Sequence, residues 1–136
     1  MKKLLVDAGP LIALFDASDQ HHKRVISQVK RFDDVLVSTW PVVTEVHHML
    51  DFNVQAQLNF MEWISLGGLK LMDLLEDDID RIIELTTKYR DVPMDLADAS
   101  LVVISEYLNT NRILSIDSDF LIFRNRFKDY LVNELD

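Results

Sequence analysis

The chain has 136 residues, of which 49% are apolar, and it carries a formal net charge of −9. This length and apolar content predict one domain, residues 1–136, with a substantial core. Because the chain has no cysteine, disulfides and thiolate metal sites are excluded, and the acidic balance argues against general binding to nucleic-acid backbones. Residues 1–19 break at Gly9-Pro10 and carry acids, so we expect no signal peptide, no membrane span and a cytoplasmic protein.

The first half of the chain alternates short apolar strands with helices. Strands are expected at residues 4–6 and 35–38, each followed by a helix with a proline in its first turn. A further helix is expected to begin at Asp19 and to reach residue 32, and another covers residues 54–66.

The second half continues the same alternation. Strands are expected at residues 69–74 and 112–116, with a fifth at residues 130–133. Helices are expected at residues 76–90 and through the apolar run of residues 94–106. The pattern predicts an α/β fold, in which helices cover both faces of a mainly parallel sheet of four to five strands.

Four acids come from four separate segments of this predicted fold. Asp7 and Asp117 each follow a strand directly, and the carboxyl ends of parallel strands are the usual location of a site in open α/β folds. Glu45 lies about one turn into the helix after the second strand, and Asp98 lies in the first turn of a helix that Asp95 is predicted to cap. The four carboxylates can therefore converge at one edge of the sheet.

Each acid also has an ordinary structural explanation. Asp7 and Asp117 can be turn residues, and Asp98 can be a partner of the helix dipole. Glu45 can be a solvated helix residue, although its largely apolar neighbours are expected to leave little room for a solvated face. The four acids together favour a site over four independent explanations.

The chemistry of clustered carboxylates predicts a bound cation. Buried carboxylates without a partner repel one another or take up protons, so a cation is needed to hold them together. Oxygen-only ligands indicate a hard metal, either Mg²⁺ or Mn²⁺, which leaves positions for substrate phosphate oxygens. Such a metal activates water and neutralises the charge that develops on a phosphodiester, so the predicted reaction is metal-assisted phosphoester hydrolysis.

Four stretches, VDAGPLIALFD, TEVHHML, PMDLADASLVV and LSIDSDF, occur in an order and spacing that resemble the PIN domain, and more narrowly the VapC-type toxins of bacterial toxin–antitoxin pairs. The resemblance covers essentially the whole chain as one PIN-like domain. It implies catalytic roles for Asp7, Glu45, Asp98 and Asp117, with Asp7, Asp98 and Asp117 as metal ligands. It also implies auxiliary roles for Asp95, Asp119 and Ser115.

The resemblance further implies a fold, an activity and partners. These are a Rossmann-like three-layer α/β/α sandwich, cleavage of RNA that depends on Mg²⁺ or Mn²⁺, a homodimer, and an antitoxin that covers the acidic pocket. The chain departs from the family pattern at two positions. Gly9 stands where the family often has Ser or Thr, and Ser115 replaces Thr but keeps a hydroxyl.

Alternative interpretations remain open for the function and for other residues. A degenerate PIN module that binds RNA or a protein partner without cutting is the main rival, whereas a haloacid-dehalogenase-type enzyme would need a second aspartate where Gly9 stands. The pairs His21-His22 and His47-His48 are either ligands or, in our preferred reading, packing, capping and surface residues. Trp40 and Trp63 either stack on bases or are buried.

Overall fold

A computed structural model of the chain describes residues 2–92, 94–116, 123 and 131–135. The strands in these residues are β1 (Lys3–Val6), β2 (Val35–Thr39), β3 (Lys70–Met72), β4 (Arg112–Leu114) and β5 (Val132–Asn133). The helices are α1 (Ala8–Phe15), α2 (His22–Val29), α3 (Trp40–Met49), α4 (Val54–Ser65), the 3-10 helix η1 (Glu76–Asp78), α5 (Ile79–Lys88) and α6 (Leu96–Leu108). Within these ranges, no helix has both the length and the apolar character that a membrane crossing requires.

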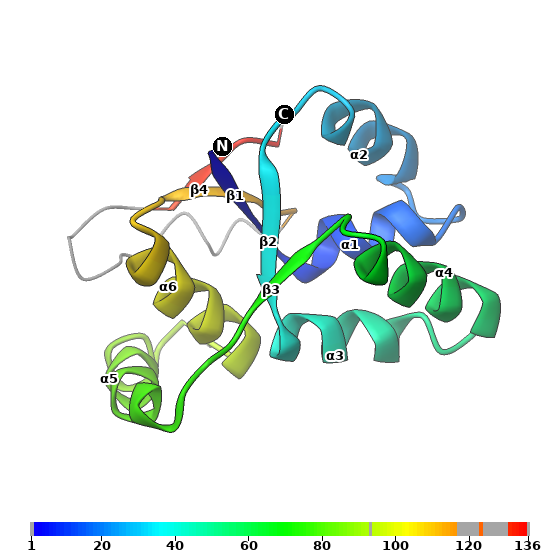
Figure 1. Cartoon of the computed structure of the whole chain (residues 1–136). Coiled ribbons are helices and arrows are strands. Elements are labelled where there is room, and N and C mark those ends of the chain that lie inside the picture. Colours follow the sequence, from blue (N-terminus) through cyan, green and yellow to red (C-terminus); the bar gives the residue numbers. More distant parts are fainter. Residues whose placement is uncertain (1, 93, 117–122, 124–130, 136) are drawn as a thin grey trace.

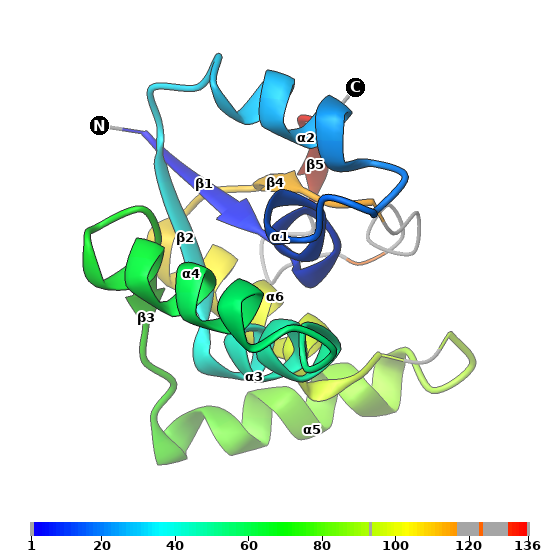
Figure 2. The ribbon, with the colours of Figure 1, turned by 90° about the vertical axis from the view of Figure 1, so that its right-hand side faces the viewer.

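The strands form one parallel sheet in the order β3-β2-β1-β4-β5. Helices α1, α2 and α4 lie on one side of this sheet, and α5 and α6 lie on the other (Figures 1 and 2). Helix α3 continues directly from the end of β2 and packs against both α1 and α6. The predicted α/β fold with a sheet between two helical layers is therefore confirmed.

Strand β1 lies at the centre of the sheet, and its position explains its composition. Leu4 and Leu5 are fully buried, because β1 has a strand on each side and a helical layer on each face. Helix α6 carries a buried run from Ala99 to Ser105, since it packs against the sheet, α3 and α5 together. A helix covered on so many sides reads as an almost continuous apolar sequence rather than as one apolar stripe.

The start of α2 differs from the prediction. Asp19 was expected to begin the helix, but α2 begins at His22. Asp19 instead closes a turn ahead of it: its carboxylate accepts from the His21 N–H at 2.8 Å, and its carbonyl accepts from the His22 N–H at 3.0 Å. The His22 ring Nδ1 lies 2.6 Å from the Ala13 carbonyl oxygen, so His22 ties α2 to α1.

Trp63 is a packing residue in this fold. Its ring centroid lies 5.4 Å from that of Phe15, between α1 and α4. Gly68 passes so close beneath the indole that a Cβ atom there would lie 2.0 Å from Trp63 Nε1. The glycine at this position is therefore required by the close approach of the chain to the ring.

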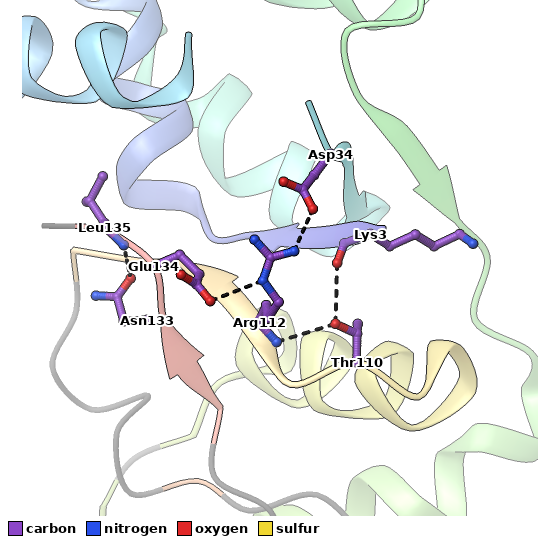
Figure 3. A network of polar contacts seen from close by, with 7 residues as sticks. All are labelled: Lys3, Asp34, Thr110, Arg112, Asn133, Glu134 and Leu135. Carbon is purple, nitrogen blue, oxygen red and sulfur yellow. Dashed lines mark hydrogen bonds and ion pairs between the residues drawn. The ribbon is translucent and has the colours of Figure 1, made fainter. Parts of the chain in front are cut away.

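Arg112 joins three segments at the amino end of the sheet (Figure 3). Its guanidinium donates to Asp34 Oδ2 at 2.5 Å, just ahead of β2, and to Glu134 Oε1 at 3.0 Å, just after β5. The nearby Thr110 hydroxyl donates to the Lys3 carbonyl at 3.3 Å. These bonds fasten the short strands β4 and β5 to the rest of the sheet.

We expect Arg112→Ala to lower the free energy of unfolding by about 1–3 kcal/mol, because it leaves the largely buried Asp34 carboxylate without this donor. Urea denaturation followed by circular dichroism measures the change. The exposed Lys23→Ala is the control and should stay within about 0.5 kcal/mol of the parent chain. Equal effects of the two substitutions would show that the Arg112 bonds contribute little.

Candidate active site

The carboxyl edge of the sheet holds Asp7 between β1 and β4. Asp7 directly follows β1, is only 6% exposed, and donates its main-chain N–H to the Leu114 carbonyl at 3.0 Å. Although it occupies the N-cap position of α1, its side chain does not cap that helix. The Ser115 hydroxyl, which follows β4, donates to Asp7 Oδ2 at 3.2 Å. The two strand ends therefore meet where the strand order reverses, the usual place for a site in this class of fold.

Asp95 and Asp98 form a reciprocal capping box at the start of α6. The Asp98 N–H donates to Asp95 Oδ1 at 2.8 Å, and the Asp95 N–H donates to Asp98 Oδ2 at 3.2 Å. The predicted N-cap role of Asp95 is therefore confirmed. The box also fixes the backbone and one oxygen of Asp98, so the Asp98 carboxylate has a defined position at the end of α6 nearest the sheet edge.

The surroundings of Asp98 favour its neutral form. Burial is the largest cause that raises its pKa, followed by the negative charges of Asp95 and Asp7, and together they bring the pKa to about 8. Because Asp7 contributes to this shift, the Asp7 and Asp98 carboxylates lie within electrostatic reach of each other. The fold thus brings together two predicted acids that are 91 positions apart in the sequence.

Glu45 lies on the exposed side of α3, which contradicts the expectation that its neighbours leave little solvated face. The buried side of α3 is narrow and consists of only three residues, Val42, Val43 and Val46. Glu45 and Asp95 both line a pocket of about 620 Å³, so the helical glutamate faces the same recess as the start of α6.

This pocket has a mostly apolar lining at the junction of α3 and α6. Trp40 and Leu96 are 52% and 57% exposed and form part of its wall together with Pro41 and Ala97. Trp40 is therefore a surface residue, in contrast to Trp63. His48 also lines the pocket, and its ring Nδ1 lies 3.9 Å from Asp51 Oδ2.

The predicted site residues Asp117 and Asp119 lie outside the described residues. Within the ranges that the structure describes, no three His, Asp or Glu side chains are grouped closely enough to hold a metal ion. Of the predicted metal ligands, the described part of the site therefore contains the pair Asp7 and Asp98. Ser115, the predicted auxiliary residue, contacts Asp7 as described above.

No family model matches the chain. A curated relative, ribonuclease VapC26 of Mycobacterium tuberculosis (strain ATCC 25618 / H37Rv), is 28% identical over 116 residues, which cover 84% of this chain and 86% of that protein. The chain is similar in sequence to a VapC ribonuclease.

Solved structures show a likeness of the fold as well. Mycobacterium tuberculosis VapC20, a toxin that cleaves the sarcin–ricin loop, superposes with a TM-score of 0.76 at 16% identity, covering 85% of this chain and 91% of that one. A toxin–antitoxin complex from Klebsiella pneumoniae gives a TM-score of 0.66 at 17% identity, covering 88% of this chain and 92% of that one. The predicted resemblance to VapC-type PIN domains is therefore confirmed.

The chain has a further feature that the sequence did not reveal, a buried hydroxyl pair that joins the end of β2, where Thr39 caps α3, to α6. Thr39 Oγ1 and Ser100 Oγ lie 2.7 Å apart. Ser100 donates to the Ala97 carbonyl at 2.6 Å, so the hydrogen between the two hydroxyls belongs to Thr39. Thr39 also accepts from the Val42 N–H. The pair holds the helix that carries Glu45 against the helix that carries Asp98.

The raised pKa of Asp98 predicts a pH dependence of stability in the metal-free chain. The folded protein keeps a proton that the unfolded chain releases near pH 4, so the free energy of unfolding should fall as the pH rises from about 4 to about 8. Asp98→Asn should reduce this fall, because asparagine has no charge to bury. Urea denaturation with EDTA at pH 5 and pH 8 measures the difference.

The exposed Asp91→Asn is the matched control for this experiment, and it should keep the full fall in stability. If Asp98→Asn and Asp91→Asn showed the same pH dependence, Asp98 would not be the group responsible.

Proposed function

We propose that this chain is an endoribonuclease of the VapC type, which hydrolyses RNA phosphodiester bonds at the carboxyl edge of the sheet. The observation that carries the proposal is the buried position of Asp7 at the strand-order reversal, within electrostatic reach of Asp98, on a fold shared with VapC20. The sequence likeness to ribonuclease VapC26 supports the same activity.

The residues at this edge have the donor chemistry that Mg²⁺ or Mn²⁺ prefers. Asp7 and Asp98 offer carboxylate oxygens. Burial and the neighbouring carboxylates favour a proton on Asp98, and a bound cation would take the place of that proton. We propose that Asp7, Asp98 and Asp117 hold the metal. Bound there, it would activate water for attack and neutralise the charge that builds on the phosphodiester.

The protein's own groups would position the reactants in this proposal. Ser115 orients Asp7 through its hydroxyl, and Asp95 orients Asp98 through the capping box. Glu45 faces the pocket from α3 and would accept a hydrogen bond or a proton there. Asp119 follows Asp117 closely in the sequence and would assist the same group.

Incubation of purified protein with a mixed RNA pool, with and without Mg²⁺, tests the function. We expect cleavage only with a divalent metal, and no cleavage by Asp7→Asn, because this substitution removes one metal-binding charge. Asp91→Asn should cleave as the parent does. Full activity in a folded Asp7→Asn variant would overturn the metal site, and an inactive parent chain would favour the alternative of a PIN module that only binds.

A second pair of variants separates the cap from the proposed ligand. Asp95→Ala should lower the free energy of unfolding by about 0.5–2 kcal/mol and reduce cleavage in part, because the lost cap loosens Asp98. Asp98→Asn should abolish metal-dependent cleavage, yet asparagine can still accept from the Asp95 N–H. Thermal melts and initial cleavage rates distinguish the two. If Asp95→Ala abolished cleavage and Asp98→Asn mainly lowered stability, Asp95 would be the ligand and Asp98 the cap.

We further propose that the chain forms a homodimer and that a small antitoxin blocks its pocket. The pocket combines an apolar wall, with Trp40 and Leu96 exposed, and the carboxylates of Glu45 and Asp95. A segment with an apolar side chain and an arginine would match both, since the guanidinium fork pairs with carboxylates. The likeness to a chain of a toxin–antitoxin complex from Klebsiella pneumoniae supports an antitoxin partner.

We expect a neighbouring small gene to encode the inhibitory partner. Its potency should fall when the Mg²⁺ concentration is raised, because the metal competes with its arginine for the carboxylates. Its potency should also fall when Trp40→Ala removes part of the apolar wall. Inhibition curves at several Mg²⁺ concentrations measure both effects. Leu66→Ala, an exposed apolar residue outside the pocket lining, is the control and should leave inhibition unchanged. If neither raised Mg²⁺ nor Trp40→Ala changed the inhibition, the partner would bind elsewhere on the surface.

A further inference from the structure

The exit of β4 toward the proposed site is held by a side chain from β5. Asn133 lies beside Ile113 in the parallel pairing of these strands. The main-chain ladder between them contains the Val132 N–H, which donates to the Asn111 carbonyl, and the Glu134 N–H, which donates to the Ile113 carbonyl at 2.7 Å. Ser115 is the residue at which the next rung of an evenly spaced parallel ladder would form.

At Ser115 the side-chain amide of Asn133 takes the place of a main-chain peptide group. Asn133 Oδ1 accepts from the Ser115 N–H at 3.1 Å, and Asn133 Nδ2 donates to the Ser115 carbonyl at 2.8 Å. The same Oδ1 accepts from the Leu135 N–H at 3.1 Å. The Asn133 amide oxygen accepts from two N–H groups and its nitrogen donates to a carbonyl, so these hydrogen bonds fix the orientation of the amide.

Asn133 fixes the position from which Ser115 contacts Asp7. Both main-chain polar groups of Ser115 are engaged by one side chain, so the position of its Cα is set from β5. Its hydroxyl then donates to Asp7 Oδ2 at 3.2 Å. Ser115 is 1% exposed and Asp7 is 6% exposed, so the contact is buried and depends on the placement of the backbone.

We propose that Asn133 is a positioning residue for the reaction, which acts on Asp7 through Ser115. This inference rests on the proposed function, because it assigns Asn133 a role in the same site. Partners that bond directly to a metal ligand, as Ser115 does to Asp7, typically change metal affinity or activity by about 10–100-fold when they are removed, and Asn133 positions this partner. Asn133→Ala should therefore lower kcat for RNA cleavage by about 10-fold or more, with a smaller change in KM.

The neighbouring residue Glu134 provides a matched control. It also anchors β5, but its carboxylate accepts from Arg112 Nε at 3.0 Å and is not bonded to Ser115. Glu134→Ala should lower the melting temperature as Asn133→Ala does, while kcat stays within about 2-fold of the parent, as for a substitution with no group at the site. If Glu134→Ala reduced kcat as much as Asn133→Ala, loosening of β5 would explain both and the positioning role would be wrong.

A double-mutant comparison tests whether the effect passes through Ser115. Ser115→Ala should lower kcat by itself, and adding Asn133→Ala should then have little further effect, because the group that Asn133 positions is already gone. The conservative Asn133→Asp keeps the acceptor for both N–H groups but sets an anionic oxygen against the Ser115 carbonyl, so it should not restore kcat. Independent, multiplicative losses in the double mutant would overturn the proposal.

Hydrogen exchange in the metal-free chain provides a readout that does not depend on activity. Asn133→Ala should accelerate exchange of the Ser115 amide, whereas the Asp7 amide, bonded to the Leu114 carbonyl, should keep its protection. Glu134→Ala should leave the Ser115 amide protected. An unchanged exchange rate of the Ser115 amide in Asn133→Ala would refute the contact itself. If the Ser115 amide exchanged faster in Asn133→Ala as expected, but the parent chain cleaved no RNA, the proposed function alone would be refuted.

Discussion

The burial of Asp98 near two other carboxylates, Asp95 and Asp7, is the constraint on which the arrangement of the site depends. Water is largely excluded from Asp7, and the burial of Asp98 together with the charges of Asp7 and Asp95 favours a proton on Asp98. Carboxylates in such positions separate unless other forces hold them. The rest of the fold supplies those forces, because Asp7 is held by its main-chain N–H and the Ser115 hydroxyl, and Asp98 is held by its capping box with Asp95.

Three sets of hydrogen bonds provide this restraint. Two of them join different elements, and the third lies within the start of α6. Ser115 joins β4 to β1 at Asp7, the capping box fixes Asp98 on α6, and the buried Thr39–Ser100 pair holds α3 against α6. None of them is a salt bridge, so they add no positive charge that would compete with a cation for the carboxylates. The positive charge of Arg112 is used at the opposite end of the sheet, where it pairs with Asp34 and Glu134 (Figure 3).

The sequence predicted the elements well where burial imposes a clear pattern. The strand that becomes β1 and the run that becomes α6 are apolar because they are covered on several sides, so Asp7 and Asp98 could be placed at their ends. The exposure of Glu45 was mispredicted, because three valines suffice to bury α3 and apolar neighbours do not imply a buried face. The start of α2 was misplaced because Asp19 caps a turn rather than a helix.

The side-chain contacts between distant segments were beyond prediction from the sequence. The pairing of Asn133 with Ser115 depends on the register of β4 and β5, and the Thr39–Ser100 pair depends on how α3 crosses α6. Each involves residues with ordinary local environments in the sequence, whose partners are set only by tertiary packing. The carboxylate positions of Asp117 and Asp119 remain predictions, because those residues lie outside the described ranges.

The central position of β1 also affects the order in which the site can be assembled during synthesis. Asp7 is made before Ser115, whose hydroxyl contacts it from 108 positions later, and β5 follows after that. Contacts of such long sequence separation form only after the intervening chain has been made and has closed on itself. A ribosome-bound chain that lacks β4 and β5 therefore has Asp7 without Ser115 and Asn133, so the complete carboxyl edge arises only after β5 has been made.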